Sequence, residues 1–238
     1  MFLSFSNRKP YELLMPQVHS IEIPDGHQGG AILNLLVKKL KTKALFVGHD
    51  FTFGKDRAGT IEILQNLCKK YVVSLSVVPA VKIRGEIISS TKIRQAIDKG
   101  DMVKARTMLG RPFYLRGVVE KGEGRGRQIG FPTANLFTTA DLLPRIGVYV
   151  TTLELNGRMY KSVTNVGKNP TFDEKKRRHP VQVETFIMNF NEDIYGEAVK
   201  VHFLKFQRDE RRFNSVEDLV REIKNDVKAA EAYPWENL

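Results

Sequence analysis

The hydrophobic pattern of the chain changes near residue 110, and this change constrains the fold more than any other feature of the sequence. Before it, short apolar runs at 44–47 and 72–78 flank a segment, 61–71, whose apolar residues recur at helical spacing. A strand, a helix and a second strand in this order predict a βαβ unit with a parallel sheet. We therefore expect residues 1–110 to form an α/β domain.

Residues 111–238 show a different pattern, in which short β-rich runs follow one another without helices between them. The clearest runs lie at 118–119, 148–152, 181–188 and 199–203. Turn signals such as Asn156-Gly157 separate these runs. The arrangement predicts an antiparallel barrel or sandwich. A single amphipathic helix is expected to close this second domain, with Ser215 as its N-cap.

Bulk properties exclude several classes of protein. The single cysteine rules out an internal disulfide and a multi-cysteine metal site. No apolar run approaches the roughly 20 residues that span a bilayer, and the N-terminus does not resemble a signal peptide. We therefore expect no membrane association and a cytoplasmic location. The net charge of +11 lies mostly in residues 1–110, which is compatible with binding either nucleotides or nucleic acid.

The most informative segment is 121–135, which is rich in glycine and arginine and ends in Pro-Thr-Ala-Asn. Closely spaced glycines allow backbone N–H groups to converge on an anion, and arginines add forked donors for phosphate. The residues expected to bind ATP are Gly122, Gly124, Arg125, Gly126, Arg127, Gly130, Pro132, Thr133 and Asn135. A flexible hairpin followed by a proline turn would have the same sequence, and the Gly-Lys-Ser/Thr ending of a P-loop is missing.

Thr133 and Asn135 offer two uncharged oxygen ligands, two residues apart on an extended segment. Mg²⁺ prefers hard oxygen ligands and takes only a few from the protein when nucleotide phosphates complete its shell. The glycine and arginine loop beside this pair is therefore a candidate cradle for Mg–ATP.

Residues 130–135 closely resemble the signature of riboflavin kinases. The resemblance continues in order through residues 111–232, at Gly147-Val148-Tyr149, Asn165-Val166-Gly167, Asn169-Pro170-Thr171-Phe172, Val183-Glu184-Thr185, Asp193-Ile194-Tyr195-Gly196 and 206–213. It implies a six-stranded antiparallel barrel with a C-terminal helix. It also implies an enzyme that transfers the γ-phosphate of ATP to the 5′-hydroxyl of riboflavin, giving FMN and ADP.

The same resemblance assigns roles to individual residues. It implies that Thr133 and Asn135 bind the Mg²⁺ of ATP and that Glu184 is the general base, although a surface carboxylate paired with a lysine or arginine would look the same. Flavin contacts are expected from Asn165, Thr171, Arg208 and Phe213. For Phe213, packing against the last helix is an equal alternative.

Residues 47–55 and 88–94 resemble the two later motifs of the FMN adenylyltransferase module of bacterial bifunctional FAD synthetases. This resemblance implies an incomplete, nucleotidyltransferase-like parallel sheet and a vestigial site. The residues concerned are Asp50, Phe51, Phe53, Ser90, Thr91 and Arg94. A helix that begins at Ser90-Thr91 would present free N–H groups to a phosphate, but a simple helix cap has the same sequence.

The histidine-containing first segment of that module has no counterpart in the 238 residues. We therefore expect a riboflavin kinase in which adenylyl transfer is absent or very weak. One alternative is a longer gene product that carries the segment and also makes FAD. Another is a regulator whose basic first region binds flavin-related RNA, although no nucleic-acid motif supports it and its aromatic residues are not interleaved with basic ones.

Overall fold

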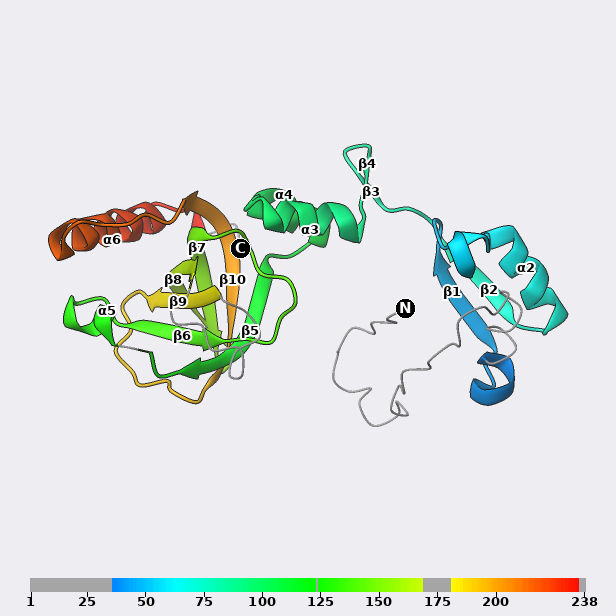
Figure 1. The fold of residues 1–238 in the computed structure, drawn as a ribbon, viewed down its shortest axis with the longest axis horizontal. Helices are drawn as coiled ribbons and strands as arrows, with labels where there is room; N and C mark the ends of the chain where they lie inside the picture. The colour runs from blue at the N-terminus through cyan, green and yellow to red at the C-terminus, as the bar shows by residue number, and fades with distance from the viewer. Residues whose placement is uncertain (1–35, 123, 169–180, 236–238) are drawn as a thin grey trace. The chain divides into compact units, whose positions relative to one another are not determined.

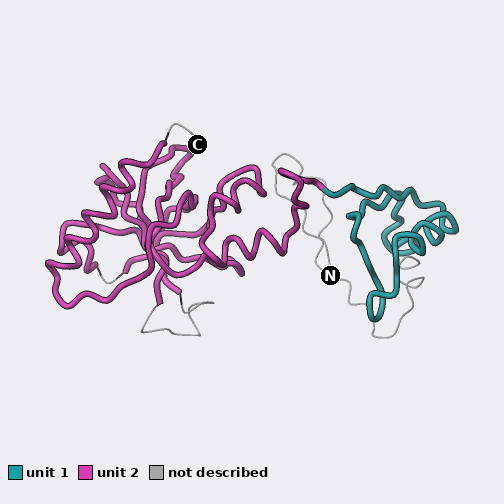
Figure 2. The backbone as a smooth tube through the Cα atoms, turned by 90° about the horizontal axis from the view of Figure 1, so that it is seen from above, with its two compact units in different colours: residues 1–80 teal, residues 81–238 magenta. Residues whose placement is uncertain are grey.

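The computed structural model describes residues 36–122, 124–168 and 181–235 (Figure 1). Contacts divide the chain into two compact units, residues 1–80 and 81–238 (Figure 2). The boundary between the units precedes residue 110 because the two helices before that residue pack with the second unit. The predicted domains 1–110 and 111–238 follow from the change in hydrophobic pattern rather than from contacts, and they stay a prediction.

The first unit is built around a strand, helix, strand motif. Its elements are β1 (Ala44–Gly48), the 3₁₀ turn η2 (Lys55–Arg57), α2 (Ile61–Lys70) and β2 (Ser74–Val78). β1 and β2 pair in parallel, which confirms the predicted α/β unit. The Thr60 hydroxyl caps α2 by accepting a hydrogen bond from the Ile63 N–H. Leu64 and Cys68 of α2 pack against the inward side chains of the sheet, while Phe46 on the other face is 75% exposed.

The second unit opens with a short hairpin and two helices, β3 (Lys82–Ile83), β4 (Glu86–Ile87), α3 (Ser90–Asp98) and α4 (Met102–Leu109). The side chains of Ser89 and Asp101 cap α3 and α4, and Gly110 ends α4 in the left-handed conformation. Ile97 and Met102 are buried in the same apolar cluster as the barrel interior. The two helices therefore belong to the core of the second unit.

Six antiparallel strands then form a closed barrel in the order β10-β5-β6-β9-β8-β7. They are β5 (Phe113–Glu120), β6 (Thr133–Phe137), β7 (Gly147–Leu155), β8 (Arg158–Lys168), β9 (Val181–Ile187) and β10 (Ala198–Arg208). The predicted turn Asn156-Gly157 joins β7 to β8, and both residues have positive φ, as a two-residue type I′ turn requires. The barrel confirms the fold implied by the resemblance.

Alternation along the strands divides the barrel into an inner and an outer face. Large apolar side chains such as Leu115, Leu153 and Phe203 fill the interior. A ladder of buried hydroxyls crosses it, with hydrogen bonds of 2.8–2.9 Å that link Thr151, Ser162, Thr164 and Thr185. The interior is therefore a packed core, and any binding site has to lie on the outer face or at the ends.

The terminal helix α6 (Val216–Glu231) packs on the outer face of β7 and β8. Ser215 caps it, as predicted, by accepting a hydrogen bond from the Asp218 N–H. Ala230 and Val227 of the helix contact an apolar cluster that includes Val150 and Val163. This packing confirms the predicted amphipathic helix.

Lowering the pH from about 7.5 to about 5.5 is expected to destabilise the second unit through His202. Burial on the outer face of the barrel lowers the pKa of His202, and the Glu154 carboxylate, 3.2 Å away, opposes this only in part. Below about pH 6.5 the unfolded chain therefore binds a proton that the folded chain disfavours, so stability falls as the pH falls. The thermal midpoint should drop less over this range in His202→Gln. An equal drop in both proteins would contradict this assignment.

Candidate functional site

The sequence-predicted residues Thr133, Asn135 and Glu184 lie on the same outer face of the barrel. Strands β6 and β9 pair with Asn135 directly opposite Glu184 and with Thr133 opposite Phe186. Directly opposite residues in an antiparallel pair point to the same side, and residues two apart on one strand do so as well. This strand pairing brings together Asn135 and Glu184, which are 49 positions apart in the sequence.

A short row of polar side chains runs across three adjacent strands at this point. Asn165 of β8 is paired with Glu184 on the side opposite Asn135. Gln182 of β9 donates through its amide nitrogen to Asn135 Oδ1 at 2.6 Å and to Glu184 Oε1 at 2.8 Å. Asn135 is only 6% exposed. The outer face therefore holds a half-buried cluster of oxygen atoms rather than isolated surface residues.

The glycine-rich segment lies directly against this cluster. A Cβ atom at Gly122 would stand 2.2 Å from Asn135 Nδ2, so only glycine fits there without displacing the Asn135 side chain. A Cβ at Gly126 would stand 2.3 Å from the Phe131 carbonyl oxygen and 3.4 Å from Thr133 Oγ1. The backbone of this segment therefore packs closely against Asn135 and lies beside Thr133.

Part of the glycine-rich segment forms a single helical turn, α5 (Arg125–Gln128), where the sequence suggested a loop. Gly124 and Gly130 flank the turn with φ values of 72° and 84°. Hydrogen bonds from the N–H groups of Ile129, Gly130 and Phe131 to carbonyls at 126 and 127 hold the turn closed. Arg125 and Arg127 are thus carried on a compact turn, and Pro132 leads directly into β6.

A cleft of about 570 Å³ lies between this turn and α6. Its apolar wall comes from Ile129, Val216 and Val220, and its remaining lining residues are Gln128, Glu217, Arg221, Lys224 and Asn225. Sequence reasoning missed this cleft. In the sequence, residues 128–129 are typical of a loop and the α6 residues are typical of an exposed helix face. Only the fold brings these two segments together.

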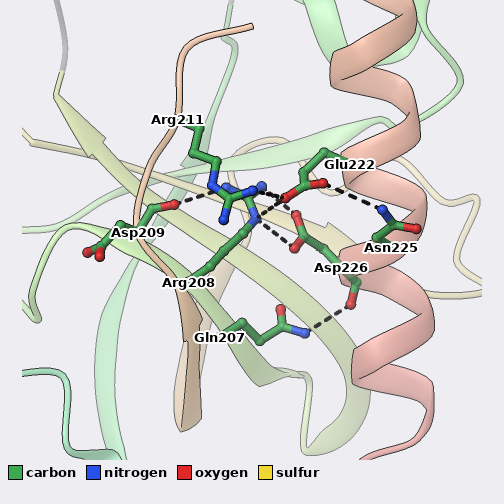
Figure 3. A network of polar contacts seen from close by, with 7 residues as sticks. All are labelled: Gln207, Arg208, Asp209, Arg211, Glu222, Asn225 and Asp226. Atoms are coloured by element: carbon green, nitrogen blue, oxygen red, sulfur yellow. Dashed lines mark hydrogen bonds and ion pairs between the residues drawn. The ribbon is translucent and has the colours of Figure 1, made fainter.

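Arg208, one of the expected flavin contacts, is held by carboxylates of α6 (Figure 3). Its Nε and Nη2 atoms donate to the two oxygens of Asp226 at 2.9 and 2.6 Å, and Glu222 lies 3.4 Å away. The guanidinium also lies 6.0 Å from the centre of the Phe213 ring. The structure thus shows Arg208 as a link between the end of β10 and α6, and its contact with flavin stays a prediction.

The other predicted site residues are distributed as follows. Asn165 is half-buried beside Glu184, and Thr171 lies outside the described residues. Asp50, Phe51 and Phe53 belong to the first compact unit, where the two rings stack at 5.9 Å and Phe53 is buried. Ser90, Thr91 and Arg94 belong to the second unit on α3, whose cap is Ser89 rather than Ser90. The two parts of the expected vestigial site thus fall in separate units.

The donor set on the outer face fits a magnesium ion bound together with a nucleotide. It consists of the Thr133 hydroxyl and the Asn135 amide oxygen, both hard oxygen donors, with the Glu184 carboxylate, the expected base, opposite Asn135. Within the described part of the chain, no group of three or more His, Cys, Asp or Glu side chains could hold a metal without further ligands. Mg²⁺ held by Thr133 and Asn135 would complete its shell with water and nucleotide phosphate oxygens.

The chain matches two family models. The model described as riboflavin kinase covers residues 109–234, and the model described as FAD synthetase covers residues 29–92. In the residues that the structure describes, no helix has the length and apolarity needed to cross a membrane.

Curated relatives resemble the chain over most of its length. The bifunctional riboflavin kinase/FMN adenylyltransferase of Bacillus subtilis is 37% identical over 82% of this chain and 61% of its own length. The protein of the same name from Escherichia coli K12 is 36% identical over 85% of this chain and 64% of its own length. The chain thus spans a little over 60% of these relatives.

A solved structure shares the fold over most of the chain. It is described as a macrolide-efflux protein from Streptococcus pneumoniae, is 37% identical and superimposes with a TM-score of 0.73. The match covers 87% of this chain and 66% of the other.

Proposed function

Because the chain belongs to the riboflavin kinase family, we propose that it transfers the γ-phosphate of ATP to the 5′-hydroxyl of riboflavin and so produces FMN. The observation that carries this proposal is the pairing of Asn135 with Glu184 on one face, with Thr133 beside them. This pairing places two neutral oxygen ligands next to a carboxylate that can act as a base. The backbone at Gly122 and Gly126 packs closely beside these residues, and its N–H groups would bind phosphate oxygens.

Thr133 and Asn135 would hold Mg²⁺ together with ATP. The ion, when bound, neutralises charge on the phosphates, which is the main need in phosphoryl transfer. The backbone at Gly122, Gly124, Gly126 and Gly130, with the forked donors of Arg125 and Arg127, would bind the phosphate oxygens. Pro132 fixes the backbone where the glycine-rich segment enters β6.

Glu184 would accept the proton of the riboflavin 5′-hydroxyl. As the hydroxyl oxygen bonds to the γ-phosphorus, the bond from that phosphorus to the β–γ bridging oxygen breaks and ADP leaves. A carboxylate within hydrogen-bond reach of the hydroxyl keeps the attacking oxygen aligned as its proton departs. The row formed by Asn135, Glu184 and Asn165 gives this carboxylate a fixed place between two amides.

The cleft between α5 and α6 is the proposed site of the flavin ring. Its volume of about 570 Å³ lies within the range of small-molecule sites, and it combines an apolar wall with a polar rim. Ile129, which follows α5, and Val220 of α6 offer apolar contact from the two elements that line it. Arg208, Phe213 and Asn165, which are expected flavin contacts, are not among the residues that line this cleft, so their contact with the flavin stays a prediction.

Replacing Asn135 with alanine is expected to weaken Mg–ATP binding by roughly 10- to 100-fold, since a ligand to a charged group is lost. Titration calorimetry with Mg–ATP and with ATP in EDTA separates a metal ligand from a direct nucleotide contact, because only the first titration should change. Asn66→Ala, on an exposed face of α2, is the matched control. Equal affinity of Asn135→Ala and the parent for Mg–ATP would contradict the assignment.

FAD formation is a second candidate activity, because residues 29–92 match the FAD synthetase model and the curated relatives carry both names. For the 238-residue chain we expect FMN to accumulate and FAD to be at most a minor product. The reason is that no segment of it resembles the histidine-containing phosphate-binding motif of that module. Incubation with riboflavin and Mg–ATP, followed by chromatographic separation of FMN from FAD, tests both expectations. FAD produced at the rate of FMN would contradict the second.

A further inference from the structure

Gln182 occupies a central position in the polar cluster, although nothing in the sequence singled it out. It lies on β9, two residues before Glu184, and therefore on the same face. Its side-chain nitrogen donates to Asn135 Oδ1 at 2.6 Å and to Glu184 Oε1 at 2.8 Å. One NH₂ group thus bridges the expected metal ligand and the expected base.

The chemistry of the three groups fixes their orientation in turn. An ionised carboxylate only accepts hydrogen bonds, so Gln182 must present its NH₂ group, not its carbonyl, to Glu184. The second proton of that NH₂ group then requires an acceptor, so Asn135 must present its oxygen. The Asn135 nitrogen consequently points toward Gly122, where a Cβ would stand 2.2 Å from it.

The two hydrogen bonds of Gln182 also keep the Asn135 side-chain amide from rotating by 180°. An asparagine amide can rotate by 180° and exchange its oxygen for its nitrogen, and a nitrogen facing a cation cannot act as a ligand. An amide oxygen has two lone pairs, so the bond from Gln182 leaves Asn135 Oδ1 able to bind a metal as well. A carboxylate also accepts several hydrogen bonds, so the bond from Gln182 does not by itself prevent Glu184 from taking a proton.

We propose that Gln182 is a positioning residue that holds the Asn135 amide oxygen and the Glu184 carboxylate in the arrangement that binds Mg–ATP and accepts the hydroxyl proton. This inference rests on the proposed kinase function. Gln182 need not touch the substrate in this role; it acts through the two residues that do.

Two substitutions of Gln182 separate donation from packing. Gln182→Met keeps the length of the side chain but cannot donate, and Gln182→Glu keeps its shape but places a negative charge beside Glu184. For Gln182→Met, loss of the two hydrogen bonds should raise the Kd of a non-hydrolysable Mg–ATP analogue about five- to tenfold and lower kcat by a similar factor. Gln182→Glu should lower kcat further at neutral pH.

The binding measurement does not depend on turnover, so it distinguishes this inference from the kinase proposal. If the parent protein does not phosphorylate riboflavin, the proposed function fails, while a weaker Kd in Gln182→Met still supports positioning of the nucleotide ligand. If the parent is active and Gln182→Met matches it in Kd and kcat, the inference fails alone. Gln95→Met, an exposed position on α3, is the matched control and should change none of these values. A lower thermal midpoint with a parental Kd for the Mg–ATP analogue would assign Gln182 a packing role and overturn the proposal.

Discussion

Replacing Glu184 with glutamine is expected to lower the turnover of riboflavin phosphorylation about 100-fold, in line with the usual contribution of a general base. The glutamine side chain has the same shape and still accepts a hydrogen bond, but it cannot take the hydroxyl proton at neutral pH. Most of the catalysis in phosphoryl transfer comes from positioning and charge neutralisation, so the variant should keep residual activity. Its affinity for Mg–ATP should stay within a few-fold of the parent.

Initial rates of FMN formation, together with calorimetric titration of Mg–ATP, measure these two effects separately. Glu154→Gln is the matched control, because Glu154 is also a half-buried carboxylate on the outer face of the barrel. Its partners there are Lys200 and His202 rather than the polar cluster of β6 and β9. The control should keep parental turnover. Parental turnover in Glu184→Gln would remove Glu184 from the site even if the fold is correct.

The second large effect is expected on stability, from Asp226→Ala. Arg208 and Asp226 form a bidentate pair whose side chains are only 14% and 9% exposed, and Asp226→Ala leaves the guanidinium largely buried. Breaking a buried pair by removing one partner typically costs about 3–5 kcal/mol. We expect about 3 kcal/mol here, because Glu222 remains 3.4 Å from Arg208. Chemical denaturation of the full chain, with fluorescence from Trp235 on α6's side of the barrel, measures the loss.

Two further variants test the reason for this loss. Asp209→Ala removes an exposed carboxylate paired with Arg145 and should cost at most about 1 kcal/mol. The double variant Arg208→Met with Asp226→Leu should recover most of the stability, since apolar replacements of a buried pair are often neutral. A double variant as unstable as Asp226→Ala alone would contradict the buried-pair account. Its KM for riboflavin, once it is folded, tests the predicted flavin contact of Arg208: a raised KM supports that contact, and an unchanged KM assigns Arg208 to the link with α6 alone.

Local sequence patterns predicted several elements of the fold, and each has a local physical cause. The βαβ unit follows from apolar periodicity, and Ser215 at the start of α6 follows from the need to satisfy free N–H groups at a helix terminus. Asn156-Gly157 follows from the positive φ that the β7–β8 turn requires. The closed barrel, as opposed to a sandwich, came from family resemblance, because alternation alone does not say which strand edges meet.

The features that the sequence did not reveal all depend on long-range pairing. Asn135 was expected to bind the metal and Glu184 to be the general base, but only the β6–β9 register sets them opposite one another. Gln182 carries no motif, and its bridging role exists only because strand alternation turns it toward Glu184. The α5–α6 cleft likewise needs two segments about 90 residues apart to lie side by side. The boundary between the two compact units lies after residue 80 rather than at the predicted residue 110. The difference arises because α3 and α4 share an apolar cluster with the barrel interior, a long-range contact as well.

The most direct test of the proposed chemistry follows a single phosphate. The full chain is incubated with riboflavin, Mg²⁺ and ATP labelled in the γ-phosphate, and the products are separated. We predict labelled FMN and unlabelled ADP in equal amounts, with no product when riboflavin is left out. Label that stays in ATP, or appears only as free phosphate whether or not riboflavin is present, would contradict the proposal that the Thr133, Asn135 and Glu184 face is a riboflavin kinase site.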